Sequence, residues 1–431
     1  MGLNERLLLV TAVVMRLCVT GFVGIVLFGY SHVHASTPVY EAVIDAGSSG
    51  TRLYLYEYRN EPQGPVVSLL LEDEPDKLRG LSTYADKPEQ AGQGEIGPLL
   101  DGLETFVKTK GIDPKAVSVS VLATAGMRLA EPGAAQRIYD SVRQEIGRRG
   151  LVAREVGTIT GQSEGIYAWV DVNYLKGNLR LGQTTEGIVE IGGASAQVAL
   201  AVDSSGQYGG FIRRVQIGEQ TYDVLSVSYL GLGQNEARRV MLEQTAAEAP
   251  ALNPCYPNSQ SDSVVFDAAK GRKGVNALKV AGNKSSFTPA CFDIYASVVQ
   301  STAARAINRF PVAQFQSVPG FESSRFVLMA SLYHKLRDWD LLGEKRPDRS
   351  LLAEVFGRCV GVDAWATVSG RQGTGFFAQN ACANATYLYT FLFSGRGLSL
   401  SSSRVQVLDE VNGEPLTWTR GYALLAAGSS K

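Results

Sequence analysis

Histidine and cysteine are scarce in this sequence, and its charges nearly cancel. Its 431 residues include 3 histidines and 5 cysteines. The histidines are too scattered for a histidine-based zinc site, and no Cys-x-x-Cys pair occurs, which argues against a thiolate metal site as well. The formal net charge of -1 gives no electrostatic reason to expect nucleic acid or an anionic membrane surface as a partner.

Long apolar runs are missing after the N-terminal segment. No later run reaches the roughly 18 residues that a membrane helix needs, so no C-terminal membrane helix is expected. Before that point the chain has Arg6 and Arg16 as its basic residues, an apolar segment over 17–30, and a small-residue pattern that ends at Ala35. This predicts a signal peptide over residues 1–35, with an uncleaved membrane anchor as the alternative. We expect a secreted or periplasmic protein with no stable membrane span after cleavage, and a monomer.

Cysteine usage agrees with export. Cys18 would leave with the signal peptide, and Cys255, Cys291, Cys359 and Cys382 would remain. Four cysteines in an exported protein suggest two disulfides, for which three connectivities are possible. We expect the most local pairing, which is Cys255–Cys291 and Cys359–Cys382.

The stretch over residues 41–58 carries the strongest signal. An apolar run over 42–44 ends on Asp45, a turn of small and hydroxyl residues follows over 46–51, and leucines then alternate with tyrosines. This pattern predicts two strands joined by a tight turn. Consecutive backbone N–H groups in such a turn form a concavity that suits phosphate, and Asp45 could face a cation that accompanies the phosphate. An ordinary hairpin with a polar turn is the alternative.

The same pattern returns later in the chain. An apolar strand over 187–191 carries Glu190, a glycine-rich turn follows, and a second strand leads away through Ser195 and Gln197. Asp45 and Glu190 lie 145 residues apart. The repetition indicates a duplicated architecture, in which two β-rich halves present their phosphate turns to one shared site.

Two further strand ends carry polar residues. A buried strand is expected over 117–122, followed by Thr124 and Arg128, and another over 156–160, followed by Glu164. Glycines at 161 and 165 bracket Glu164, which could be a catalytic acid or only an acid that favours a helix N-terminus. Elsewhere we expect a polar loop over 77–97, a surface excursion over 250–287 and a helix over 293–310.

Four of these segments together resemble a known family. Asp45-Ala-Gly-Ser-Ser-Gly-Thr-Arg52, Ala123-Thr-Ala-Gly-Met-Arg-Leu129, Gly161-Gln-Ser-Glu-Gly-Ile-Tyr-Ala-Trp169 and Gly192-Gly-Ala-Ser-Ala-Gln197 are similar, in order, to motifs of the nucleoside triphosphate diphosphohydrolases, or apyrases. The absence of a C-terminal membrane helix resembles the soluble and bacterial members. The resemblance implies an α/β fold with two ribonuclease H-like domains of the actin-like ATPase type and a nucleotide cleft between them. Residues 36–160 and 397–431 would form the first domain, and residues 161–396 the second.

The resemblance also implies a role for each matching residue. Glu164 corresponds to the catalytic base, Ser195 and Gln197 to the pair that orients the attacking water, and Thr124 and Arg128 to residues near the terminal phosphate. Asp45 and Glu190 correspond to acids that hold a Mg or Ca ion through its waters, although the family commonly has Asp where this chain has Glu190. The nucleotide-binding residues would be Ser48, Ser49, Gly50, Thr51, Arg52, Gly192, Gly193, Ala194, Ser195 and, as a base-stacking aromatic, Tyr333.

We therefore expect hydrolysis of nucleoside tri- and diphosphates to the monophosphate and phosphate. Such a reaction needs charge neutralisation on the phosphoryl oxygens and an aligned water, which phosphate turns, a divalent metal and a carboxylate can provide. The alternatives are an exopolyphosphatase of the same superfamily and an actin-like protein that binds nucleotide without hydrolysing it.

Overall fold

The first of two large sheets is built around the opening motif. The computed structural model describes residues 38–61, 64–75, 78–203, 208–246, 252–256, 261–265, 277–282, 287–303, 305, 308–330 and 380–428. Its first sheet has the order β3-β2-β1-β4-β5. The strands are β1 (Val39–Ala46), β2 (Thr51–Glu61), β3 (Gly64–Asp73), β4 (Val117–Ala123) and β5 (Val152–Thr158). β1, β2 and β3 pair antiparallel, whereas β4 joins β1 and β5 joins β4 in parallel.

The second sheet repeats this topology. It has the order β14-β13-β6-β7-β9-β8 and consists of β6 (Gly187–Ile191), β7 (Ser195–Ala201), β8 (Ile212–Ile217), β9 (Gln220–Leu230), β13 (Phe326–Ala330) and β14 (Val405–Val407). β6, β7 and β9 pair antiparallel, and β13 and β14 continue from β6 in parallel, just as β4 and β5 continue from β1. The predicted duplication and the α/β class are confirmed, and β8 is an added edge strand.

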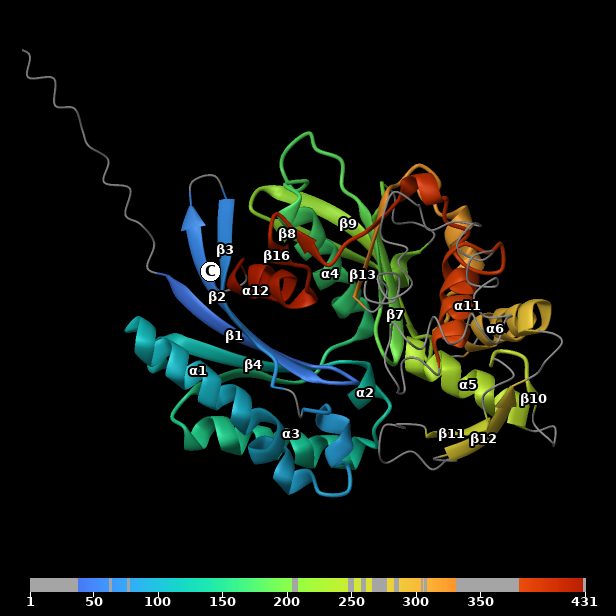
Figure 1. Cartoon of the computed structure of the whole chain (residues 1–431). Helices are drawn as coiled ribbons and strands as arrows, with labels where there is room; N and C mark the ends of the chain where they lie inside the picture. Colours follow the sequence, from blue (N-terminus) through green and yellow to red (C-terminus); the bar gives the residue numbers. More distant parts are fainter. Residues whose placement is uncertain are drawn as a thin grey trace, which may run out of the picture. The chain divides into compact units, whose positions relative to one another are not determined.

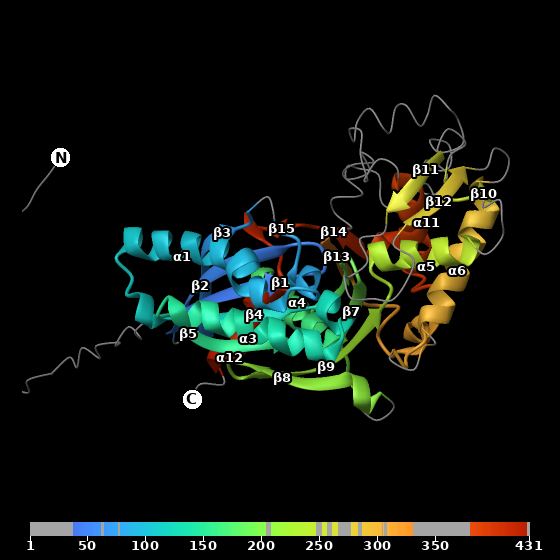
Figure 2. The ribbon, with the colours of Figure 1, turned by 90° about the horizontal axis from the view of Figure 1, so that it is seen from below.

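Helices cover both sheets. α1 (Gly97–Lys110) and α3 (Pro132–Arg148) share a core with one face of the first sheet (Figure 2). α4 (Gly161–Leu175) and α12 (Trp418–Gly428) share a core with the other face of that sheet and with the second sheet (Figure 1). The far face of the second sheet packs against α5 (Gln234–Ala246), α6 (Phe287–Ala303) and α11 (Ala381–Leu392).

The C-terminal helix α12 returns to the N-terminal part of the chain. This C-terminal helix packs against α4 and against β1 and β2 of the first sheet. Gly421 allows the close approach to α4, since a β-carbon there would lie 2.0 Å from the Tyr167 carbonyl oxygen. Residues 36–431 form one unit by their contacts. The domain boundaries after residues 160 and 396, and the signal peptide over 1–35, stay predictions. None of the described helices is both long and apolar enough to cross a membrane.

Three expectations about local structure were incomplete. The loop expected over 77–97 contains short helical turns, including a π-helical turn, Gly92–Ile96. The helix expected over 293–310 is α6, which begins and ends earlier in the chain, over Phe287–Ala303. The surface excursion expected over 250–287 includes a small sheet of β10 (Leu252–Asn253), β11 (Ser261–Val265) and β12 (Ala277–Gly282).

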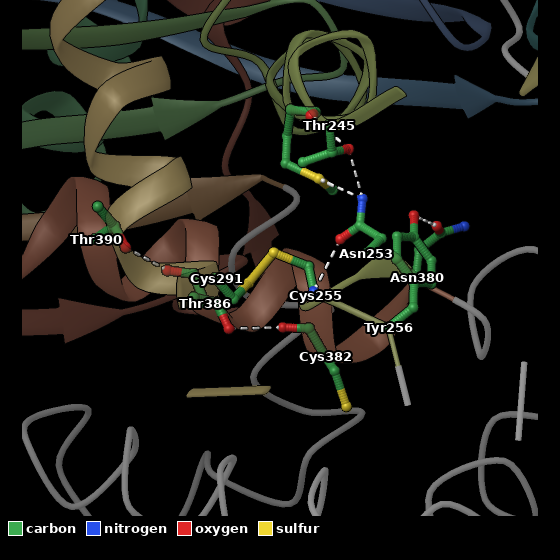
Figure 3. The surroundings of a disulfide bond; sticks show 10 residues. Thr245, Asn253, Cys255, Tyr256, Cys291, Asn380, Cys382, Thr386 and Thr390 are labelled. Atoms are coloured by element: carbon green, nitrogen blue, oxygen red, sulfur yellow. Dashed lines mark hydrogen bonds between the residues drawn. A yellow bond between two sulfur atoms is a disulfide. The ribbon is translucent and has the colours of Figure 1, made fainter. Parts of the chain in front are cut away.

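The disulfide Cys255–Cys291 is confirmed and links the segment after β10 to α6. Figure 3 shows its surroundings, where the Cys255 backbone N–H donates to Asn253 Oδ1 at 2.8 Å and the Tyr256 hydroxyl donates to Asn380 Oδ1 at 2.7 Å. Both cysteines of this pair are fully buried. Cys382 is also disulfide-bonded, whereas its expected partner Cys359 lies outside the described residues.

Candidate active site

The two acids of the repeated motif occupy equivalent positions. Asp45 and Glu190 are each the last residue but one of the first strand in their sheet. In the strand pairing, Asp45 lies opposite Arg52 and Glu190 lies opposite Gln197. Because side chains alternate along a strand, Asp45 shares a face with Val43 and Glu190 shares a face with Ile188, and both apolar residues belong to the core between the sheets. The duplicated topology thus directs both acids toward the same layer.

Both acids are held in surroundings that disfavour their charge. Asp45 Oδ1 and Glu190 Oε2 are shielded from solvent and accept no hydrogen bond. Burial, with a further contribution from the Glu164 carboxylate, raises the pKa of Asp45 to about 7, while Arg52 opposes the shift. Burial and the carboxylates of Glu164 and Asp45 raise the pKa of Glu190 well above its usual range. A half-buried and a buried acid, each with one shielded oxygen that accepts no hydrogen bond, fit a hydrated divalent cation, which would compensate their charge.

Direct ligation by a larger cluster is not supported. The described part of the chain contains no group of three or more His, Cys, Asp or Glu side chains that could hold a metal ion. A pair of acids that contacts a cation through its waters needs no such cluster, since hydrated Mg²⁺ is commonly bound through one or two carboxylates.

The two glycine-rich turns lie against each other. Gly193 is so close to the first turn that a β-carbon on it would lie 2.5 Å from Ser48 Oγ. Ala194 packs with Ala125, which belongs to the short helix α2 (Ala125–Arg128) after β4. The predicted phosphate-binding residues Ser48, Ser49, Gly50, Gly192, Gly193 and Ala194 are therefore brought to one place from both sheets.

Two residues of the first turn point elsewhere. Thr51 is buried, and its hydroxyl donates to Glu95 Oε1 at 2.5 Å. Arg52 forms an ion pair with Glu74 at 2.7 Å, and this partner raises the pKa of the guanidinium. This leaves the backbone N–H groups and the serine hydroxyls as the groups of the turn that could donate to a phosphate.

Arg128 links the halves of the site. Its Nε donates to the Ile159 carbonyl oxygen at 3.1 Å, which fixes the guanidinium against the strand that leads to α4. Its Nη1 donates to Ser195 Oγ at 3.4 Å, and its Nη2 is ion-paired with Glu164. Thr124, buried just before α2, donates its backbone N–H to the Ala46 carbonyl oxygen at the end of β1.

Glu164 lies in the first turn of α4 rather than at the strand end itself. Thr160 caps the helix by accepting a hydrogen bond from the Ser163 backbone N–H at 3.0 Å. Gln197 Nε2 then donates to Glu164 Oε2 at 3.0 Å and to Ser195 Oγ at 2.6 Å. A carboxylate beside a hydroxyl and an amide can accept a proton from a water that the other two groups orient.

Glycine at 161 and 165 allows α4 to approach β9 closely. A β-carbon at Gly161 would lie 2.1 Å from Ser228 Oγ and 2.9 Å from Arg128 Nη1. One at Gly165 would lie 2.5 Å from Ser226 Oγ. The bracketing glycines in the sequence therefore reflect how near Glu164 must come to Gln197.

Several residues that contribute here had not been predicted. Glu95 contacts the first turn, Ser228 Oγ accepts from Gln197 Nε2 at 3.3 Å, and a hydrogen bond with Trp418 lowers the pKa of Asp45. Trp418 brings the C-terminal helix α12 to the site. Nothing in the local sequence around Glu95 or Ser228 distinguishes them from other polar residues. Tyr333 lies outside the described residues.

Comparisons with known proteins agree with this arrangement. Residues 32–431 match the profile of the GDA1/CD39 (nucleoside phosphatase) family. The chain is 30% identical over 440 residues to probable apyrase 4 of Arabidopsis thaliana, with 95% of this chain and 84% of the plant protein covered. It is also 30% identical over 263 residues to ectonucleoside triphosphate diphosphohydrolase 6 of Mus musculus, with 57% of each chain covered.

A solved structure shows the same fold. Nucleoside triphosphate hydrolases from Neospora caninum align with a TM-score of 0.57 at 16% identity, covering 91% of this chain and 93% of that one. The predicted family, and with it the prediction of a hydrolase of the apyrase type, is confirmed by the match over nearly the whole sequence: the chain belongs to the GDA1/CD39 (nucleoside phosphatase) family.

Proposed function

We propose that the chain hydrolyses nucleoside 5′-triphosphates and diphosphates to the monophosphate and phosphate, by in-line attack of a water that Glu164 activates. The observation that carries this proposal is the convergence of Glu164, Gln197, Ser195 and Arg128 beside two turns that touch each other. A base, two groups that can hold a water and a cation for phosphate are the parts that phosphoryl transfer to water needs.

The substrate would bind with its phosphates along the two turns. Backbone N–H groups of residues 48–51 and 192–195 would donate to the phosphoryl oxygens, and Arg128 and Thr124 would lie near the terminal phosphate. Arg128 now donates to both Ser195 and Glu164, so it can shift toward a phosphate oxygen without leaving the site. The attacking water would be held by Ser195 and Gln197. Glu164 would take its proton as the bond to phosphorus forms and the phosphoanhydride bond to the departing nucleoside di- or monophosphate breaks.

A divalent cation, Mg or Ca, fits the carboxylates of Asp45 and Glu190, which would hold it through its waters. When bound, such a cation neutralises charge on the phosphoryl oxygens and orients the leaving group. The unsatisfied oxygens of the two acids support this assignment. A diphosphate product could bind again with its β-phosphate at the same place, which permits two successive cleavages.

Phosphate release from the purified protein tests the proposal. ATP, ADP, AMP and polyphosphate are supplied in turn, first with Mg²⁺ and then with a chelator. Release from ATP and ADP but not from AMP, lost with chelator, is the expected result. Release from polyphosphate alone would instead indicate an exopolyphosphatase, and binding of ATP by folded protein without any release would indicate an actin-like nucleotide-binding protein.

We also propose that the protein acts outside the cytoplasm, as a soluble member of the family whose first 35 residues are removed after Ala35. The disulfide Cys255–Cys291 supports this location, because disulfides persist in oxidising compartments. N-terminal sequencing of the protein from its native source would find Ser36 first; retention of residues 1–35 would contradict the cleavage.

A further inference from the structure

Glu95 is a buried acid that the proposed chemistry does not use. It lies in the π-helical turn Gly92–Ile96 that precedes α1, and only 1% of its surface is exposed. An acidic side chain is rarely buried so completely unless its charge is compensated by close partners. Single π-helical turns are rare and frequently occur at functional sites.

The hydrogen-bond partners of Glu95 lie in the first phosphate-binding turn and in the segment over residues 79–80. The Thr51 hydroxyl donates to Glu95 Oε1 at 2.5 Å, and the Gly80 backbone N–H donates to the same oxygen at 2.6 Å. The Arg79 backbone N–H approaches Oε2 at 3.4 Å. A carboxylate can accept several hydrogen bonds at once, and bonds to a charged acceptor are stronger than neutral ones.

Gly80 contacts both Glu95 and the first turn. Its φ angle of 89° is one that glycine adopts readily, and a β-carbon there would lie 2.5 Å from the Gly47 carbonyl oxygen. On the opposite side of the turn, a β-carbon at Gly126 would lie 3.0 Å from Ser48 Cα. Glu95 therefore holds one end of the turn through Thr51 and supports the other end through Gly80.

We propose that Glu95 is a positioning residue that fixes the first phosphate-binding turn in the conformation that receives the substrate phosphates. This inference rests on the proposed function, because it takes residues 48–51 to contact phosphate. Glu95 touches neither the substrate nor the attacking water. It aligns the N–H groups of the turn by accepting the Thr51 hydroxyl and the Gly80 N–H together.

The test is a double-mutant cycle between Glu95 and Thr51. Glu95→Gln keeps the shape of the side chain but removes the charge that strengthens its two bonds at Oε1, and Thr51→Val keeps the shape of threonine without its hydroxyl. Each is expected to raise KM for ATP roughly 10- to 100-fold with a smaller change in kcat, because the turn binds phosphate in the ground state as well. The double variant should lose less than the sum of the two single losses, because both changes weaken the contact between Thr51 and Glu95.

Controls separate positioning from folding. Glu41 is another buried acid, which lies on β1 toward the end remote from the turn and accepts from Ser120 Oγ at 2.6 Å. Glu41→Gln should leave KM for ATP unchanged even if it lowers the unfolding temperature. Glu95→Asp, which keeps the charge, should recover part of the loss of Glu95→Gln; if Glu95→Gln does not fold, Thr51→Val and Glu95→Asp still show whether KM depends on this contact.

The outcomes are distinct. If the wild-type protein releases no phosphate from ATP or ADP, the proposed function itself is contradicted. Wild-type turnover together with folded Glu95→Gln and Thr51→Val proteins of unchanged KM would overturn the role of Glu95 and leave the function standing. Fully additive losses in the double variant would also overturn it, because the two residues would then act independently.

Discussion

Gly193 lies directly against Ser48, although the two residues belong to turns of different sheets. A β-carbon on Gly193 would lie 2.5 Å from Ser48 Oγ and 3.3 Å from Asn235 Nδ2. Contacts this close exclude any side chain at 193 unless Ser48 moves. The two turns of the duplicated motif therefore form one continuous surface, which we propose as the phosphate site.

Gly193→Ala should weaken substrate binding. The added methyl group would displace the Ser48 hydroxyl, so we expect KM for ATP to rise by about tenfold, the loss that one hydrogen bond to a charged group commonly brings. In a Ser48→Ala background the same change should have little further effect, because the clashing oxygen is gone. Steady-state kinetics of the four proteins measure this.

The matched control is Gly147→Ala on α3, where a β-carbon would meet nothing within 4 Å. This change should leave KM alone and slightly raise the unfolding temperature, since alanine is favoured over glycine inside a helix. An equal rise in KM for both alanine variants would show that the effect at position 193 does not come from contact with Ser48.

Gly165→Ala should impair catalysis more than binding. Its methyl group would lie 2.5 Å from Ser226 Oγ and 3.4 Å from Gln197 Cβ, so α4 would have to move away from β9 and carry Glu164 with it. Overpacking of this kind typically costs about 1–3 kcal/mol of stability. We expect kcat to fall at least about tenfold while KM changes little, and unchanged kcat in a folded variant would contradict the packing argument.

Asp45→Asn should make the metal-free protein more stable and the enzyme inactive. Because burial raises the pKa of Asp45 from 3.8 to about 7, the folded state binds this proton more tightly than the unfolded state does. The contribution of Asp45 to the unfolding free energy must therefore decrease as the pH rises from about 4 to about 7. At pH 8, with chelator present, Asp45→Asn should unfold at a higher temperature than wild type.

A further prediction concerns how a cation changes the stability of wild type and of Asp45→Asn. Mg²⁺ or Ca²⁺ should raise the unfolding temperature of the wild type by mass action and should have little effect on Asp45→Asn. A variant that is still stabilised by the cation as strongly as wild type would place the cation elsewhere.

The ion pair between Asp171 and Arg420 should hold the C-terminal helix in place. The two side chains meet at 2.7 Å with no exposed surface, and Asp171 Oδ2 also accepts the Thr417 backbone N–H at 2.8 Å. Arg420→Met leaves a buried carboxylate without its partner, so we expect a loss of about 3–5 kcal/mol in the free energy of unfolding. The double change Asp171→Leu with Arg420→Met should lose less; chemical denaturation distinguishes the two results.

Local patterns in the sequence were sufficient to predict which residues meet at the centre of the candidate site. Each of the two sheets has a motif of an apolar strand, an acid and a glycine-rich turn. Such a motif can be recognised from neighbouring residues alone. The strand pairing then placed Asp45 and Glu190 at equivalent positions, as the repetition had indicated. Glu164, Ser195, Gln197 and Arg128 came together because each follows or occupies a strand end that the pattern had identified.

What could not be predicted depends on tertiary contacts. Glu95 reaches Thr51 across 44 positions of sequence, and its neighbours have the small, polar character of any loop. Ser226 and Ser228 contribute through tertiary contacts, because glycines of α4 lie against both and Ser228 also accepts from Gln197. The small sheet over 252–282 was missed because its strands are short and separated by polar residues, which read as a surface segment.

The most direct measurement is the rate of phosphate release from ATP by Glu164→Gln, with Mg²⁺ at saturation. If Glu164 takes the proton of the attacking water, kcat should fall several hundred-fold or more, within the factor of about 10²–10⁴ that general bases provide, while ATP still binds. A folded Glu164→Gln protein that releases phosphate at a nearly normal rate would contradict the mechanism.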